Sequence, residues 1–99
     1  MLLSEEHLRG WRAFYGPKRG QLEIMAEVLM RCRTAKAKTR IMYENNLSYG
    51  QLRNILRLLL SRRLLELDDT NYVTTDKGLD YVEQFAGINA LLSGSLREA

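Results

Sequence analysis

Hydrophobic residues recur at helical spacing over the first long apolar stretch of the chain. Between about Arg19 and Arg33 they lie three or four residues apart on one stripe, namely Leu22, Met25, Leu29 and Cys32, widened by Val28. This spacing predicts a helix whose stripe faces a core. Cys32 is then interpreted as a small buried apolar residue and not as a redox group.

Two further helical segments follow, with a polar turn between them. The segment from Lys36 to Asn45 places Ile41 and Met42 among basic and polar neighbours, which predicts a short second helix. Ser48 and Gln51 then have the Ser-x-x-Gln spacing of a capping box, so a third helix is predicted to start at Ser48 and to run to about Ser61. Two helices this close in sequence indicate a helix-turn-helix.

The predicted third helix separates apolar from polar residues. Its buried side is expected to carry aliphatic residues only, namely Leu52, Ile55, Leu56, Leu59 and Leu60. Its other faces would carry Tyr49, Gln51, Arg53, Asn54 and Arg57. At about 1.5 Å per residue such a helix is roughly 21 Å long, which is enough to span a DNA major groove about 12 Å wide.

The rest of the pattern predicts a hairpin and a terminal helix. Two short β-like runs, 64–67 and 72–74, are joined by four turn-forming residues. Thr75 would cap the last helix, with Asp76 in its first turn. On that helix Tyr81, Phe85, Ile88 and Leu92 recur at the spacing of a coiled-coil seam. The stripe either pairs with a second copy, which we predict, or folds back on its own domain.

Residues 1–18 are predicted to be an appendage to the main module. Ser4 is a candidate N-cap, and Leu8, Trp11 and Tyr15 have the spacing of a short amphipathic helix. Gly16-Pro17 then marks a linker. The expected organisation is therefore an appendage (1–18), a head of three helices and a hairpin (19–74), and a C-terminal helix (75–99) that we predict to dimerise.

Composition narrows the class of protein. The 99 residues, 45% hydrophobic and 27% charged, are enough for one folded core. The single cysteine excludes an internal disulfide and a thiolate metal cage within one chain. No apolar run is long enough to cross a bilayer, and the first residues lack the pattern of a signal peptide. We therefore expect a cytoplasmic, nucleoid-associated protein without a membrane partner.

Charge is strongly segregated along the chain. Residues 1–63 contain 13 Lys and Arg against 5 Asp and Glu, whereas residues 64–99 contain 2 against 7. Between Arg31 and Arg63 the only acid is Glu44. Such a basic block attracts polyanions, although a solvated basic face balanced by the acidic half is the alternative interpretation.

Helix, helix-turn-helix, hairpin and helix is the order of elements in a winged helix, and several short motifs fit one family. The motifs are Lys38 to Tyr43, Asn46 to Tyr49, Gln51-Leu52, Leu64-Leu65, and Tyr72 with Thr75 to Gly78. Together they closely resemble the small archaeal winged-helix DNA-binding proteins, which include dimeric chromatin-associated proteins and transcription regulators. The similarity spans roughly Arg19 to Leu92.

The resemblance implies a mainly α-helical winged helix-turn-helix with a small β-hairpin wing. It also implies that the C-terminal helix pairs with that of a second protomer as an antiparallel coiled coil. The sequence departs from the family pattern at three places. Arg63 stands where a glycine commonly precedes the first wing strand, Ala37 interrupts a basic pair, and the final helix is short and carries Gly87 and Gly94.

The predicted function is double-stranded DNA binding by a homodimer, in transcriptional regulation or chromatin organisation. Gln51, Asn54 and Arg53 are the candidates for reading bases, although for Gln51 the cap alone is an alternative explanation. Phosphate contacts are predicted for the basic residues that flank or follow the helix and for one phenol, namely Lys36, Lys38, Arg40, Tyr49, Arg57, Arg62 and Arg63.

Several residues have a simpler interpretation. Tyr49 is more often a packing residue against the second helix, and Met42 and Tyr43 are expected in core and turn packing. Asp68 and Asp69 are interpreted as turn residues and not as a metal or acid-base pair. Their charge at the tip of the wing argues against a strong contact between wing and phosphate.

The sequence contains no motif of a catalytic, metal or phosphate-cradling site. No G-x-S-x-G, HExxH, CxxC or glycine-rich phosphate loop is present. We therefore predict no enzymatic activity, no metal, no cofactor and no small-molecule ligand. The alternatives to DNA binding are a winged-helix module whose basic face docks an acidic protein, and RNA binding. RNA binding lacks the support of clustered exposed aromatic residues.

Overall fold

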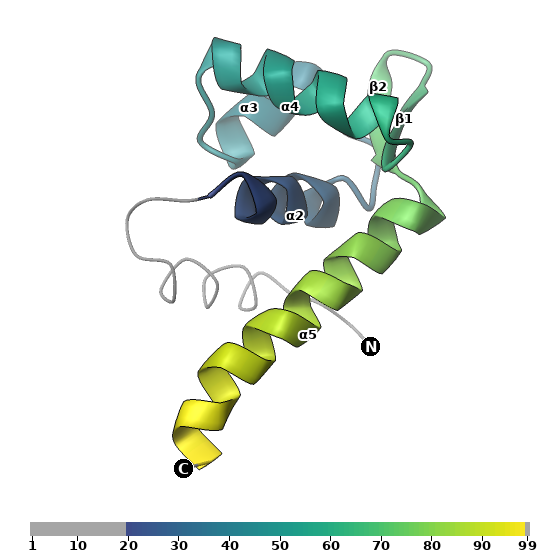
Figure 1. Cartoon of the computed structure of the whole chain (residues 1–99). Coiled ribbons are helices and arrows are strands. Elements are labelled where there is room, and N and C mark those ends of the chain that lie inside the picture. The colour runs from purple at the N-terminus through teal and green to yellow at the C-terminus, as the bar shows by residue number, and fades with distance from the viewer. Residues whose placement is uncertain (1–19, 99) are drawn as a thin grey trace.

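The computed structural model describes residues 20–98 of the backbone and the side chains of residues 20–92. The predicted appendage, with its candidate cap Ser4 and its stripe of Leu8, Trp11 and Tyr15, lies outside the described residues. Three helices, α2 (Gln21–Arg31), α3 (Lys38–Glu44) and α4 (Tyr49–Ser61), form a head beside the hairpin β1 (Leu65–Asp68) and β2 (Asn71–Thr74). The last helix, α5 (Asp76–Glu98), starts at the hairpin, packs against α2 and extends beyond the head (Figure 1). The predicted fold class is confirmed.

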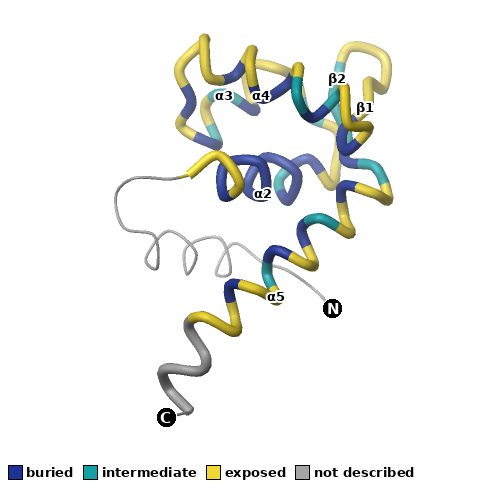
Figure 2. The backbone as a smooth tube through the Cα atoms, viewed as in Figure 1, coloured by how far each residue is buried: buried dark blue, intermediate teal, exposed yellow. Residues whose placement is uncertain are grey.

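Helix α2 is the most deeply buried element, as the dark tube in Figure 2 shows. Met25, Val28, Leu29 and Cys32 are buried as predicted, and burial raises the pKa of the Cys32 thiol to about 12. The prediction for Leu22 is wrong, because this residue is 62% exposed in the first turn of α2. Buried acids on the same helix, Glu23 and Glu27, were not predicted by the apolar stripe.

Helix α3 starts two residues later than predicted, for a reason that lies in the hairpin. The Lys36 N–H donates to the Tyr72 carbonyl at 2.9 Å, and the Tyr72 N–H donates to the Lys36 carbonyl at 2.8 Å. Lys36 therefore forms an isolated antiparallel bridge with β2 and is extended. This bridge ties the start of the helix-turn-helix to the wing.

The capping box at the start of α4 is confirmed. The Gln51 N–H donates to Ser48 Oγ at 3.2 Å, and the Ser48 N–H donates to Gln51 Oε1 at 2.9 Å. The expected aliphatic side of the helix is buried at Leu52, Ile55, Leu56 and Leu59, whereas Leu60 is only half-buried. The packing prediction for Tyr43 is wrong, since its side chain is 80% exposed, and Met42 is half-buried against the core.

The hairpin has a shorter turn than predicted. Leu65 pairs with Thr74, and Asp68 pairs with Asn71, so that only Asp69 and Thr70 form the turn. Asp69 has a φ of 62°, in the left-handed region that aspartate tolerates better than most residues. The four residues of the sequence prediction therefore include the last pair of the ladder.

The junction between the hairpin and α5 is closely packed. The Gly78 N–H donates to Thr75 Oγ1 at 3.0 Å, which confirms Thr75 as the cap of this helix. A side chain at position 78 would collide with the Leu64 carbonyl and would lie 2.6 Å from Thr74 Cγ2. Helix α5 has 23 residues and lies within the predicted range 75–99.

No helix in the described part of the chain is long and apolar enough to cross a membrane.

Candidate nucleic-acid interface

The outer face of α4 is polar and exposed over its whole length. Gln51, Arg53, Asn54 and Arg57 are all exposed, on the side of the helix opposite the buried aliphatic residues. Tyr49, Arg53 and Arg57 are spaced four residues apart, so their side chains follow one edge of this face. The sequence prediction that these residues stay outside the core is confirmed.

A small hollow of about 200 Å³ lies beside that edge of α4. Lys38 at the start of α3, Tyr72 of β2 and the three residues of the α4 edge surround it, and the buried residues Leu52 and Leu56 line it as well. Three of the lining side chains are cationic and none is acidic. Lysine, arginine and tyrosine side chains from three elements therefore line one hollow.

Tyr49 contributes to this hollow instead of packing against α3. Its side chain is 62% exposed, and the guanidinium carbon of Arg53 lies 5.8 Å from the centroid of its ring. This distance is within the range of a cation–π contact. The preferred interpretation of Tyr49 as a packing residue is therefore not supported, and its phenol lies among the predicted phosphate contacts.

Two of the predicted phosphate contacts are paired with the one acid of the basic block. Arg40 Nε donates to Glu44 Oε2 at 2.8 Å, and Lys36 Nζ lies 3.2 Å from Glu44 Oε1. The hydrogen bond from Arg40 is the main cause that lowers the pKa of Glu44, and Lys36 adds to it. The side chain of Lys36 is only 22% exposed, against 67% for Arg40, so Arg40 remains the more accessible of the two cations.

The two amide side chains predicted to read bases differ in what they already bind. Gln51 Oε1 accepts the Ser48 N–H, so the oxygen that a bidentate pair with adenine requires is engaged in the helix cap. The Asn54 side chain makes no hydrogen bond within the described part of the chain and is exposed on the α4 face. Asn54 is therefore the better placed of the two for contact with a base edge.

Arg62 and Arg63 are exposed at the end of α4 and do not line the hollow. Arg63 has a φ of 60°, in the left-handed region where glycine is favoured. This backbone conformation gives a physical reason for the glycine that commonly precedes the first wing strand. The arginine here keeps a positive charge at the cost of backbone strain.

One residue of this surface was missed by the sequence analysis. Tyr72 was assigned only to a strand, yet it lines the hollow with the three cations. The apolar residues Tyr72 and Val73 indicate a strand, but the sequence does not show which helix the Tyr72 side chain faces. The bridge to Lys36 holds Tyr72 beside the start of the helix-turn-helix, and the Tyr72 side chain lines the hollow with Lys38 and the α4 edge.

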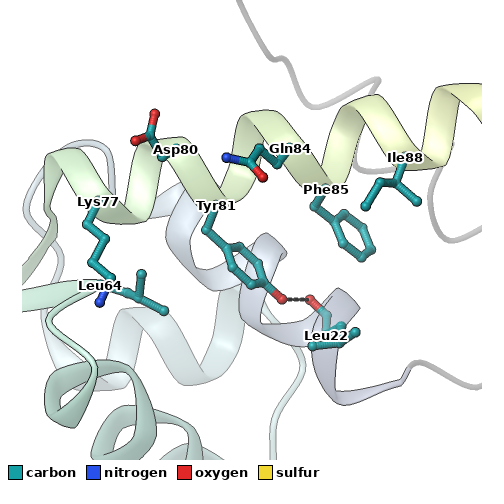
Figure 3. A pocket seen from close by; sticks show the side chains of 8 residues that line it. All are labelled: Leu22, Leu64, Lys77, Asp80, Tyr81, Gln84, Phe85 and Ile88. Carbon is teal, nitrogen blue, oxygen red and sulfur yellow. Dashed lines mark hydrogen bonds between the residues drawn. The ribbon is translucent and has the colours of Figure 1, made fainter.

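The predicted dimer seam is divided between two environments. Phe85 is 9% exposed and Tyr81 is half-buried, and the Tyr81 hydroxyl donates to the Leu22 carbonyl at 2.8 Å. Figure 3 shows both rings directed from α5 toward the start of α2, where they line a groove of about 460 Å³ with Ile88 and Leu64. Ile88 and Leu92 are 57% and 48% exposed. The first half of the seam thus packs within the head.

The residues described here include no cluster of histidine, cysteine and acidic side chains suited to hold a metal ion. Asp69 lies in the hairpin turn, as predicted, whereas Asp68 is the last paired residue of β1.

The chain is similar to known winged helix-turn-helix proteins in sequence and in structure. The winged helix-turn-helix family matches residues 18–93. Among solved structures, the chain is similar to Sso10a-2, a DNA-binding protein from Sulfolobus solfataricus, with 25% sequence identity and a TM-score of 0.64, covering 81% of this chain and 92% of that one. No curated protein sequence matches the chain.

A second solved structure shares the fold at lower sequence identity. It is MepR, a transcription regulator of the Staphylococcus aureus multidrug efflux pump MepA, with 17% identity and a TM-score of 0.65, covering 95% of this chain and 73% of that one. The family match covers the head and most of α5, and the observed order of helices and hairpin agrees with it. The chain belongs to the winged helix-turn-helix family.

Proposed function

We propose that this protein binds double-stranded DNA, with α4 in the major groove, and acts in transcriptional regulation or chromatin organisation. The observation that carries the proposal is the exposed face of α4, where Arg53 and Arg57 stand without a carboxylate partner among the described residues. With 13 residues, α4 is roughly 20 Å long at about 1.5 Å per residue, longer than the major groove is wide. The similarity to an archaeal DNA-binding protein supports the same function.

The proposed contacts divide into base reading and phosphate binding. Asn54 is the leading base-reading residue, Gln51 is secondary because of its role in the cap, and Arg53 faces either a base or a phosphate. The phosphate contacts are assigned to the basic residues around α3 and α4 and to one phenol: Lys36, Lys38, Arg40, Tyr49, Arg57, Arg62 and Arg63. Among these, Lys36 and Arg40 share Glu44, so they contribute less net charge than the others.

The wing is proposed to contribute little to DNA affinity. Glu66, Asp68 and Asp69 are all exposed on the hairpin, where their charge repels phosphate. Tyr72 is the hairpin residue that faces the basic edge of α4. The protein therefore contacts DNA mainly through α4 and the start of α3, and such a DNA-bound protein is expected on the nucleoid.

We propose that the protein is a homodimer that pairs through α5. Ile88, Leu91 and Leu92 are exposed apolar residues in the second half of α5. Burying such residues against a second copy removes apolar surface from water, which favours association. Tyr81 and Phe85, which belong to the same predicted seam, mainly hold α5 on α2, so the dimer contact is centred on Ile88 and Leu92.

The test is fluorescence anisotropy with a random-sequence duplex at several salt concentrations. The logarithm of the affinity should fall with the logarithm of the salt concentration, with a slope of about −0.9 for each phosphate neutralised. Arg57→Gln should weaken binding and reduce the slope by about 1, whereas Asn54→Ala should alter sequence preference and leave the slope unchanged. A salt-independent affinity, or no duplex binding at low salt together with capture of an acidic protein, would instead favour a protein-interaction module.

A further inference from the structure

The cations of the helix-turn-helix fall into two electrostatic groups. Lys36 and Arg40 are held by Glu44, through contacts of 3.2 and 2.8 Å. Lys38, Arg53 and Arg57 line the hollow between α3, α4 and β2, and no acidic residue lines it with them. Positive charge is therefore concentrated at the hollow, where no carboxylate neutralises it.

The size and lining of the hollow indicate which class of ligand it can hold. Its volume of about 200 Å³ lies below the range of roughly 300 to 1,000 Å³ that is typical for organic ligands, yet it exceeds several times the ~30 Å³ share of one water molecule. The aliphatic side chains of Leu52 and Leu56 line it beside the charges, and a less polar surrounding strengthens charged hydrogen bonds. A small anion fits these properties better than an apolar effector.

The donors around the hollow suit a phosphate group. Arginine presents a planar fork of N–H donors that matches phosphate oxygens, and a lysine ammonium adds a point charge. The hydroxyls of Tyr49 and Tyr72 make no hydrogen bond within the part of the chain that the structure describes, so both phenols retain a donor for an anion. The ring of Tyr49 lies under Arg53 and limits the directions that its guanidinium takes.

We infer that this hollow binds one backbone phosphate of the duplex, with Arg53 and Arg57 as its main ligands and Lys38, Tyr49 and Tyr72 as supporting donors. The inference rests on the proposed DNA-binding function and makes it more specific. It assigns Arg53 to phosphate and leaves Asn54 as the base-reading residue of α4. It also gives Tyr72 a role in DNA binding that neither its sequence position nor the acidic wing predicts.

The first experiment uses inorganic phosphate as the probe and the full chain, labelled with ¹⁵N. Sodium phosphate is titrated against sodium chloride at equal ionic strength while the side-chain Nε–H signals of Arg53 and Arg57 are recorded. We expect phosphate to shift both signals in the wild-type protein and to bind about tenfold more weakly to the Arg57→Gln variant, in line with the loss of a charged hydrogen bond. Arg33→Gln, at an exposed arginine that lies outside the hollow and has no assigned DNA contact, is the matched control and should bind phosphate as the wild type does.

The second experiment repeats the titration with a short duplex, and it separates the inference from the proposed function. Shifts of the Arg53 and Arg57 signals, with loss of duplex affinity in Tyr72→Phe but not in Tyr43→Phe, would support the phosphate site. Salt-dependent duplex binding without any change at these arginines would overturn the inference and leave DNA binding intact. Phosphate binding at the hollow without duplex binding would contradict both the inference and the proposed function. An unchanged melting temperature shows that each variant is folded.

Discussion

Arg40 and Glu44 form an ion pair on the face of the molecule that we assign to DNA, with 2.8 Å between Arg40 Nε and Glu44 Oε2. Lys36 reaches the same carboxylate, so one acid offsets two of the cations that the sequence assigns to phosphate. A negative charge at this place opposes the approach of a phosphate backbone. We therefore expect Glu44 to lower the DNA affinity that the basic block would otherwise have.

Replacing Glu44 with glutamine should therefore strengthen DNA binding. We expect affinity to rise a few-fold at low salt and the salt slope to steepen by about 1, because one more cation becomes available to phosphate. Anisotropy with a random-sequence duplex measures both quantities. Glu66→Gln on the hairpin is the charge-matched control, and an equal gain in that variant would show that the effect is only one of net charge.

The stability of the protein should depend on the charge of Glu44 at acid pH. The hydrogen bond from Arg40 lowers the pKa of Glu44 in the folded state. A carboxylate with a lowered pKa stabilises the fold above its ordinary pKa of about 4.3, and this contribution disappears as the pH falls through the folded value. Urea unfolding at neutral and acid pH should show wild type more stable than Glu44→Gln only at neutral pH. A difference in the free energy of unfolding that is the same at both pH values would show that the charge of Glu44 is not the cause.

Two glycines of α5 should respond in opposite directions to the same substitution. Gly78→Ala should lower the free energy of unfolding by about 1 to 3 kcal/mol, because the new methyl group meets the Leu64 carbonyl and the Thr74 side chain. A methyl group at position 87 would meet no atom of another element among the described residues, so Gly87→Ala should stabilise the helix by about 0.5 to 1 kcal/mol. Denaturant unfolding of both variants measures the two changes in the free energy of unfolding. Two changes of the same sign would contradict the prediction that Gly78 is closely packed and Gly87 is not.

Arg63 should lower the stability of the protein while adding a positive charge for DNA binding. Its φ of 60° is unfavourable for a residue with a side chain, so Arg63→Gly should raise the free energy of unfolding by about 1 kcal/mol. The same variant should bind DNA more weakly and reduce the salt slope by about 1 if Arg63 contacts a phosphate. Arg62→Gly, at a position with a φ of −93°, should not stabilise the protein. Urea unfolding and anisotropy together test both statements.

Dimerisation should depend on the exposed part of α5. Light scattering of the wild type should give about twice the chain mass of 11.5 kDa, and Ile88→Asp should reduce it to that of one chain. Leu67→Asp, at a position of equal exposure on the hairpin, should remain dimeric. A monomeric wild type at micromolar concentration would contradict the prediction. Phe85→Asp is a poor test, because Phe85 is buried and its loss would destabilise the head itself.

The elements of this fold follow from local patterns in the sequence. The apolar spacing in α2 and α4, the Ser48 and Gln51 capping box and the Thr75 cap all depend on residues within a few positions of one another, and each is confirmed. The start of α3, the length of the hairpin turn and the exposure of Leu22 were predicted wrongly. The start of α3 depends on a partner far along the chain, since Lys36 pairs with Tyr72. The turn length depends on whether Asp68 pairs with Asn71, which their residue types, both common in turns, do not reveal.

Charge and helical spacing are local properties, so the amino-acid sequence alone shows that the basic residues are concentrated up to Arg63 and that the helix after Ser48 displays several of them. Which of those charges remain available to a ligand depends on how the helices and the hairpin pack. The tertiary structure placed Lys36 and Arg40 on Glu44, and it gathered Lys38, Arg53 and Arg57 with Tyr72 around one hollow. The physical reason is that electrostatic pairing depends on distances of a few ångströms between side chains, and these distances are set by how the elements pack.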